Sequence, residues 1–231
     1  MTSTPFAVCT EWPELEIAHR SLDESFRRLS GQTDSILLEA AVVRLAAVQE
    51  DVRSLAEGKV VFTATEGWRT VYEELLRAPG LECYRSVAWI RNEDYWRDAP
   101  GRRSMQMNFQ AIQDGVRIER ILILNDFFWP AAAQQPTTDV CRWIDEQYDR
   151  GTWIGLVRES DLDAESDLLC DIGIYGSRAT GTLELDSQCR TTRFTFDFSP
   201  DGIRLAEDRW KRLSLYAVSY ANVLSHTDAS G

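Results

Sequence analysis

Residues 104–124, SMQMNFQAIQDGVRIERILIL, decide the class of fold. They predict a helix over residues 104–114, which Gly115 closes, and an apolar strand over residues 117–124 directly after it. Another strand is predicted upstream, over residues 81–90. Strand, helix and strand in this order are typical of a βαβ unit, so the stretch indicates an α/β protein.

The same rhythm continues on both sides of this unit. A helix over residues 138–148 precedes a strand over 152–157, and a short strand over 60–62 precedes a helix over 65–76. Short strands over 168–175, 181–185 and 191–198 are expected to form a meander, and a helix follows over 199–220. The expected fold class is therefore α/β, with a mixed, mostly parallel central sheet flanked by helices.

The N-terminal part differs from the rest of the chain. Residues 1–20 show no sustained period and are expected to form an irregular arm, followed by a short helix over 21–31. Residues 33–57 carry apolar positions at helical spacing. We therefore expect an arm and helical extension over 1–58 and an α/β domain over 59–231. The long helix either packs on its own domain or joins two copies in a homodimer.

Composition limits the possible partners. The 231 residues are 44% hydrophobic, which is enough to build a core, and the net charge of -12 makes nucleic acid or an anionic membrane surface an unlikely partner. Five widely spaced cysteines without a CxxC pair indicate reduced thiols, and no apolar run has the length of a membrane span. Without a basic and apolar leader, the expected location is the cytoplasm.

Complete catalytic motifs are absent from the sequence. His19 and His226 lie near the two ends, and there is no phosphate-binding loop, dinucleotide fingerprint, HExxH or EF-hand loop. We expect no metal and no cofactor. The alternating acids of residues 159–167 are best interpreted as a solvated face, with a divalent cation site as the alternative.

One segment resembles a known family. Residues 161–177, DLDAESDLLCDIGIYGS, resemble the half-site of the phospholipase D-like superfamily, whose motif is His-x-Lys-x4-Asp followed by a Gly-Ser turn. Asp171 matches the acid, and Gly176 and Ser177 match the turn, but Ala164 and Ser166 stand at the histidine and lysine positions.

The order of elements over residues 60–224 also resembles one unit of that superfamily, and residues 82–96 and 108–124 resemble uncharacterised bacterial proteins of this type. In the family the histidine is the nucleophile and the lysine neutralises the phosphate. The resemblance therefore implies a degenerate domain that does not catalyse this reaction.

Open α/β sheets place their sites at the carboxyl ends of strands, which gives a set of candidate ligand-binding residues. These are Arg85, Ser86, Asn125, Asp126, Arg158, Glu159, Asp171 and Ser177. Arginines are also dense between residues 85 and 120, where some could bind a phosphate or carboxylate. For Arg117 and Arg120 we prefer pairing with Glu119 and other acids on an exposed face.

Three functions follow, and the first is preferred. It is a non-catalytic regulatory or signalling domain that binds a small anionic ligand or a protein partner. The second is a metal-dependent phosphodiesterase or nuclease that uses Asp126, Glu159, Asp161 and Asp171. The third is a structural interaction module with an exposed aromatic patch at residues 127–129.

Overall fold

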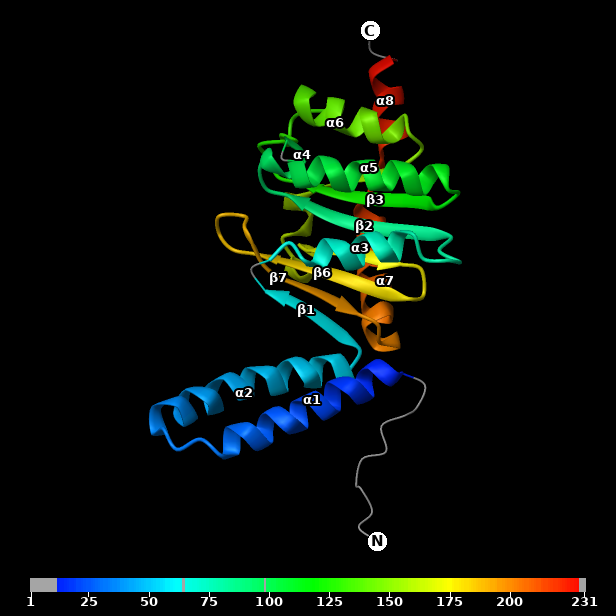
Figure 1. Cartoon of the computed structure of the whole chain (residues 1–231). Coiled ribbons are helices and arrows are strands. Elements are labelled where there is room, and N and C mark those ends of the chain that lie inside the picture. Colours follow the sequence, from blue (N-terminus) through cyan, green and yellow to red (C-terminus); the bar gives the residue numbers. More distant parts are fainter. Residues whose placement is uncertain (1–11, 64, 98, 229–231) are drawn as a thin grey trace. The chain divides into compact units, whose positions relative to one another are not determined.

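A computed structural model describes residues 12–63, 65–97 and 99–228. Eight strands form one sheet in the order β1-β7-β6-β5-β2-β3-β4-β8 (Figure 1). The strands are β1 (Lys59–Thr63), β2 (Cys83–Ile90), β3 (Arg117–Leu124), β4 (Trp153–Arg158), β5 (Asp171–Tyr175), β6 (Ala179–Leu185), β7 (Thr191–Asp197) and β8 (Val218–Ser219).

The sheet is mixed but mostly antiparallel, so the prediction of a mostly parallel sheet is wrong. Only β2, β3 and β4 run parallel to one another. The predicted meander of β5, β6 and β7 joins the free side of β2 in antiparallel pairing, and β1 and β8 pair antiparallel with β7 and β4. Strands joined by short turns can pair only antiparallel, and antiparallel pairs are more numerous here than the two parallel pairs that crossover connections join.

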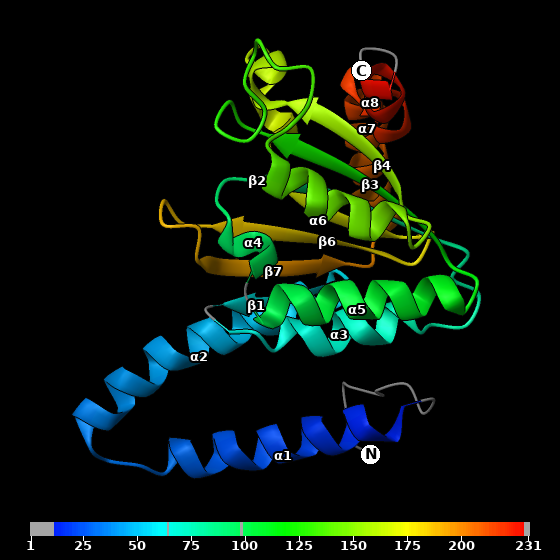
Figure 2. The same ribbon diagram turned by 90° about the horizontal axis from the view of Figure 1, so that it is seen from above.

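Helices cover both faces of the sheet. The helices α3 (Trp68–Leu76), α5 (Ala99–Gln113) and α6 (Thr138–Tyr148) lie on one face, and α7 (Pro200–Tyr216) lies on the other (Figure 2). The strand β3 alternates between these layers, with Leu122 and Leu124 packed toward α6 and Ile121 and Ile123 toward α7. All four side chains are buried, which places β3 at the centre of the core.

Two further helices, and a close contact between Gly181 and Phe194, complete the α/β part. The helix α4 (Asp94–Arg97) precedes α5, and α8 (Tyr220–Asp228) follows β8. The predicted terminal helix therefore ends earlier than expected, because residues 218–219 extend to pair with β4. Gly181 of β6 allows the ring of Phe194 to approach, since a Cβ at Gly181 would lie 2.9 Å from that ring.

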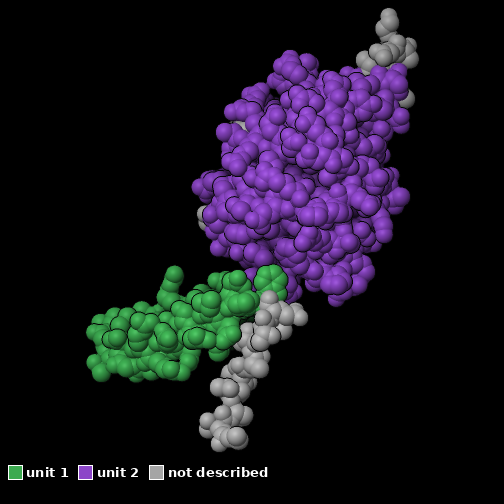
Figure 3. Space-filling model, turned by 45° about the vertical axis from the view of Figure 1, so that its right-hand side comes forward, with its two compact units in different colours: residues 1–53 green, residues 54–231 purple. Residues whose placement is uncertain are grey.

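The chain divides into two compact units, residues 1–53 and 54–231 (Figure 3). Unit 1 contains α1 (Pro13–Ser30) and most of α2 (Ser35–Ala56). The prediction of an irregular arm is wrong for residues 13–20, which begin α1 with a proline in its first turn, while residues 1–11 lie outside the described residues. None of the described helices is sufficiently long and apolar to cross a membrane.

Candidate functional site

A cavity of about 360 Å³ lies within unit 2. Its walls come from β2, β3, β5, β6 and β7 and from the helices α3, α4, α5 and α6, and its volume is in the range of small-molecule sites. The residues that matter for its chemistry are Trp68, Arg69, Tyr72, Tyr84, Ser86, Trp89, Arg91, Trp96, Asn108, Arg120, Trp143, Asp171, Tyr175, Arg190 and Phe194. Asp171 is the one acidic residue of this lining, against four arginines.

The strand β3 directs Arg120 into the cavity. Arg120 occupies the same face of β3 as Ile118 and Leu122, because side chains alternate along a strand, and it is buried. Its Nε donates to Ser86 Oγ at 3.0 Å, and one terminal nitrogen donates to Gln147 Oε1. Ser86 stands directly opposite Arg120 in the pairing of β2 with β3.

Both partners of Arg120 are uncharged. No described carboxylate lies within salt-bridge distance of its guanidinium. A buried charge is costly unless an opposite charge or a strong set of hydrogen bonds compensates it. Arg120 is thus a buried cation with neutral partners, at the wall of a cavity large enough for a ligand.

A second arginine, Arg91, reaches the cavity after the end of β2. Its guanidinium stacks over the ring of Trp89 at 4.3 Å, and its Nε is buried with no hydrogen-bond partner among the described residues. The ion pair with Asp171 is long, at 3.5 Å between Nη2 and Oδ2. Arg91 therefore keeps donor capacity for a further acceptor.

Asp171 begins β5 and is buried beside Arg91. Its Oδ1 accepts from the backbone N–H of Trp89 at 3.0 Å. Burial raises the pKa of the Asp171 carboxyl to about 6, although the Trp89 N–H and the Arg91 charge act in the opposite direction. Near neutral pH this carboxyl titrates, so the charge of the cavity wall depends on pH.

Aromatic rings form the apolar part of the lining. Trp68 stacks on Phe194 with ring centroids 4.3 Å apart, and Tyr84 stacks on Tyr175 at 4.9 Å. Trp68 Nε1 is buried and has no hydrogen-bond partner among the described residues. Aromatic rings beside unpaired donors suit a ligand that has both an apolar ring and acceptor atoms.

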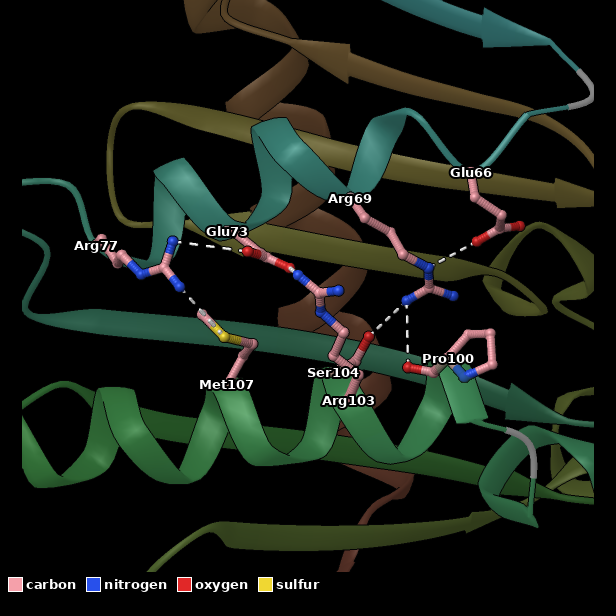
Figure 4. Close-up of polar contacts among 8 residues, drawn as sticks. All are labelled: Glu66, Arg69, Glu73, Arg77, Pro100, Arg103, Ser104 and Met107. Carbon is pink, nitrogen blue, oxygen red and sulfur yellow. Dashed lines mark hydrogen bonds and ion pairs between the residues drawn. The ribbon is translucent and has the colours of Figure 1, made fainter.

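Polar contacts between α3 and α5 hold one wall of the cavity (Figure 4). Arg69 donates to Ser104 Oγ at 2.6 Å and to the Pro100 carbonyl at 3.4 Å, and its Nε donates to Glu66 at 2.6 Å. Further along, Glu73 pairs with Arg103 at 2.9 Å. Together these contacts tie the two helices at several points along their length.

Of the eight predicted site residues, two line the cavity. Ser86 and Asp171 face it from β2 and β5. Arg85 is the neighbour of Ser86, but its Nε donates to Glu119 at 2.8 Å and its guanidinium lies 6.0 Å from the ring of Trp210 on α7. Arg85 therefore contacts the helix layer on the other face of the sheet.

The predicted residues at the ends of β3 and β4 do not line the cavity, and most of them contact the loop after β3. Asn125 Oδ1 accepts from the backbone N–H groups of residues 127 and 128, while Asp126 is exposed. Arg158 donates to the carbonyls of Trp129, Pro130 and Ala133, which lie on that loop. Glu159 accepts from Trp89 Nε1 at 2.8 Å, so it touches the cavity only through this tryptophan.

The positions matched to the phospholipase D motif are separated. Asp171 begins β5, whereas Ser177 lies exposed in the turn after β5, at the opposite end of the strand. Ala164 and Ser166 are also exposed, and neither belongs to the cavity lining. Of these four positions only Asp171 faces the cavity.

The acidic loop of residues 159–167 is bound to α7. Arg212 pairs with Asp167 at 2.8 Å and with Glu165, and Tyr216 donates to Glu165 at 2.5 Å. The Tyr216 hydrogen bond, followed by that of Arg212, lowers the pKa of Glu165. Within the described ranges, no group of histidine, cysteine, aspartate and glutamate side chains is arranged to hold a metal ion.

The aromatic run after β3 is only partly exposed. Phe127 is 70% exposed, while Phe128 and Trp129 are buried in the core against α6. The exposed aromatic patch that the interaction-module alternative requires at residues 127–129 is therefore limited to Phe127, because the Asn125 turn and the Arg158 guanidinium fold the loop back onto the sheet.

The sequence placed Arg91 and Arg120 in an arginine-dense stretch that could bind an anion, but neither was among the eight predicted site residues. The prediction that Arg120 pairs with Glu119 on an exposed face is wrong, whereas Arg117 does pair with Glu119 at 2.8 Å and is exposed. The signal was the alternation of RIERILIL, which places Arg120 on the face of Ile118 and Leu122. Arg69 had no such signal, because its helix places it beside the cavity only through tertiary packing.

Comparisons with known proteins give a likeness of fold. No protein-family model matches the chain, and no curated protein matches it. The structure is similar to Nuc from Salmonella typhimurium, a phospholipase D family member, with a TM-score of 0.49 and 11% identity over 70% of this chain and 97% of that chain. NucT from Helicobacter pylori gives a TM-score of 0.47 and 10% identity over 70% of this chain and 98% of that chain.

A further similar structure is TrmBL2, an archaeal chromatin protein with a novel mode of DNA binding. Its TM-score is 0.44, with 10% identity over 88% of this chain and 68% of that chain. With TM-scores below 0.5, these similarities leave the predicted resemblance to phospholipase D-like proteins a prediction. At these identities the likeness assigns neither an activity nor a binding partner to this chain.

Proposed function

We propose that unit 2 is a non-catalytic domain that binds a small anionic ligand with a planar group in the cavity between its sheet and the helices α3 and α5. One observation carries this proposal: the Arg120 guanidinium is buried at the cavity wall with only neutral partners. An anion at that wall would compensate the charge. Arg91 Nε and Trp68 Nε1, both buried donors without partners among the described residues, support an acceptor-rich ligand.

The aromatic lining of the cavity is the reason for expecting a planar group in the ligand. Aromatic faces offer a large contact area at low cost in side-chain entropy, and each heterocycle or aryl ring has a face that can stack on them. Because the cavity volume of about 360 Å³ exceeds that of a bare inorganic anion, an anion alone would leave the aromatic part of the cavity unfilled. We therefore expect an aryl or heteroaryl phosphate, sulfate or carboxylate.

The absence of catalysis is part of the proposal. Ala164 and Ser166 replace the histidine and lysine of the resembled family, and the cavity lining contains no histidine. The hydroxyl beside Arg120 is that of Ser86, which accepts from Arg120 Nε, and no histidine of the lining could activate it as a nucleophile. A regulatory or signalling role, in which ligand occupancy is passed to a protein partner, suits a binding domain of this kind, and the cytoplasm remains the expected location.

Isothermal titration of the full chain tests the proposal with three probes: inorganic phosphate, phenyl phosphate and adenosine 5'-monophosphate. We expect phenyl phosphate or adenosine monophosphate to bind more tightly than phosphate, because only these fill the aromatic part. Absence of heat with all three probes would contradict the proposal.

A hydrolysis assay separates binding from catalysis. The full chain is incubated with bis-p-nitrophenyl phosphate, with and without Mg²⁺ or Mn²⁺, and nitrophenol release is followed. We expect no release above the rate without protein. Metal-dependent release that is lost in Asp171→Ala would instead support the phosphodiesterase alternative.

A further inference from the structure

Unit 1 exposes an extensive apolar surface that its own residues do not cover. None of the described residues of α1 or α2 is buried. On α2, Ile36 is 77% exposed, Val42 68% and Val43 70%. Monomeric proteins rarely leave a contiguous apolar surface of this kind in water, so an additional surface is expected to cover it.

The helix α2 needs apolar neighbours on more than one side. Leu38, Ala41, Leu45, Val48, Val52 and Leu55 follow alternating steps of three and four residues, the spacing of a helix–helix seam. Ile36, Val42 and Val43 fall outside this row, so apolar side chains extend around most of the first half of the helix. A helix that is apolar nearly all round is a buried helix, and α1 can cover one side of it at most.

The charges of α1 indicate what covers this surface. Glu14 and Glu16 lie in its first turn and Arg27 and Arg28 in its last. Leu22 stands at the middle of the helix, with Glu16 six residues before it and Arg28 six residues after it. In an antiparallel pair with the same helix of a second copy, centred on Leu22, the acidic first turn of each helix would lie beside the basic last turn of the other, and Leu15 would lie level with Leu29.

A two-fold axis produces this antiparallel, self-complementary arrangement in a symmetric dimer. Other occupants fit less well. Glu39, Glu50 and Asp51 on α2, in a chain of net charge -12, disfavour an anionic lipid surface.

We propose that α1 and α2 form the interface of a homodimer, with α1 antiparallel to α1 of the second copy and the apolar surface of α2 buried between the copies. The interface uses residues 13–56 alone. It is therefore independent of the ligand cavity of unit 2 and of the function proposed for it.

The mass of the full chain in solution, measured by light scattering or sedimentation, tests the proposal. We expect twice the 26.4 kDa of one chain, and the double variant Val43→Glu/Val48→Glu should shift the mass to that of one chain. The control is Leu215→Glu on α7, where the leucine is 85% exposed, and it should leave the dimer intact. Near-ultraviolet circular dichroism checks that unit 2 stays folded in each variant.

The orientation is tested by exchanging charges. Glu16→Arg and Arg28→Glu, each made alone, should weaken the dimer, and mixing the two variants should restore association as a heterodimer. Wild-type protein that remains a monomer at every concentration, or a dimer that Val43→Glu/Val48→Glu does not dissociate, would overturn the proposal. A stable dimer in which mixing restores nothing would overturn the antiparallel arrangement of α1.

Discussion

The cavity and the outer contacts between α3 and α5 are both rich in arginine, but they use it in opposite ways. Between the helices, Glu73 accepts from Arg103 and lies within ion-pair distance of Arg77, and these arginines are exposed (Figure 4). In the cavity, Arg120 is buried with neutral partners, and Arg91 stacks over Trp89 and has only a long ion pair with Asp171. The first arrangement is complete within the chain, whereas in the second Arg91 has a distant counter-charge and Arg120 has none among the described residues.

The largest expected effect concerns Arg120. Arg120→Met should weaken binding of phenyl phosphate by at least about 30-fold, the equivalent of about 2 kcal/mol, because it removes the buried cation that faces the ligand. The measurement is a titration of the wild type and the variant under identical conditions.

The same variant, Arg120→Met, should also be compared with the wild type for stability in the absence of ligand. Replacing a buried charge that has no opposite charge by an apolar side chain of similar length should leave the melting temperature unchanged or raise it. A large fall in melting temperature would show that Ser86 and Gln147 already compensate Arg120, and the contrast between the two regions would disappear.

The next effect concerns Asp171 and pH. Its folded-state pKa of about 6 lies above its ordinary value of 3.8, so the folded protein holds a proton that the unfolded chain releases between about pH 4 and pH 6. The unfolding free energy therefore falls as pH rises through this window, by up to about 3 kcal/mol. Asp171→Asn should remove this loss, as measured by urea unfolding at pH 4.5 and pH 7.

The affinity for an anion should depend on whether Asp171 is protonated. Ionised Asp171 repels an anion in the cavity, so inorganic sulfate, which keeps its charge over this range, should bind the wild type more weakly at pH 7 than at pH 5. In Asp171→Asn the affinity should change little with pH. A wild-type affinity for sulfate that is equal at pH 5 and pH 7 would show that Asp171 does not lie close to the bound anion.

A smaller effect is expected at Gly181, where the backbone lies close to the ring of Phe194. Gly181→Ala would place a Cβ 2.9 Å from the ring of Phe194, and the displacement of that ring should cost about 1–3 kcal/mol in unfolding free energy. The double variant Gly181→Ala/Phe194→Leu should show a favourable coupling, because leucine has no ring in that position. If the two changes in unfolding free energy simply add, the Phe194 ring does not restrict the size of the side chain at residue 181.

The smallest effect is expected outside the cavity. Arg103 is 70% exposed, and Arg103→Met removes its pair with Glu73 at a cost between zero and about 1 kcal/mol. Binding of phenyl phosphate should not change. Arg103→Met is therefore the matched control for Arg120→Met, and a similar loss of binding in both would indicate a general electrostatic effect.

The fold was predictable where local signals suffice. The bounds of β3 and α6 agree with the predicted ranges 117–124 and 138–148, because Gly115 precedes β3 and Gly151 follows α6, both with positive φ. Strand direction was not predictable for β5, since its pairing with β2 depends on which edge of the sheet the meander joins. Likewise, β8 is only two residues long, and no periodic pattern marks a strand of that length.

The site was predictable only in part, for a related reason. Asp171 was found because it matches the acid of a motif, whereas Ser86 was assigned to the end of its strand and lies at the middle of β2; both line the cavity. Asn125 and Arg158 satisfied the same positional rule, yet their side chains bind the loop after β3. Position along a strand thus selects the edge of the sheet, while tertiary contacts decide which side chains remain available to a ligand.

The stacked indoles of Trp96 and Trp143 have an optical consequence. Their ring centroids lie 5.2 Å apart at an interplanar angle of 19°, and both rings line the cavity, from α4 and α6. Two chromophores this close couple their excited states, so the pair should contribute an exciton couplet to the circular dichroism spectrum. A ligand that displaces α4 would alter this couplet, and the protein would then report occupancy of its own cavity without a label.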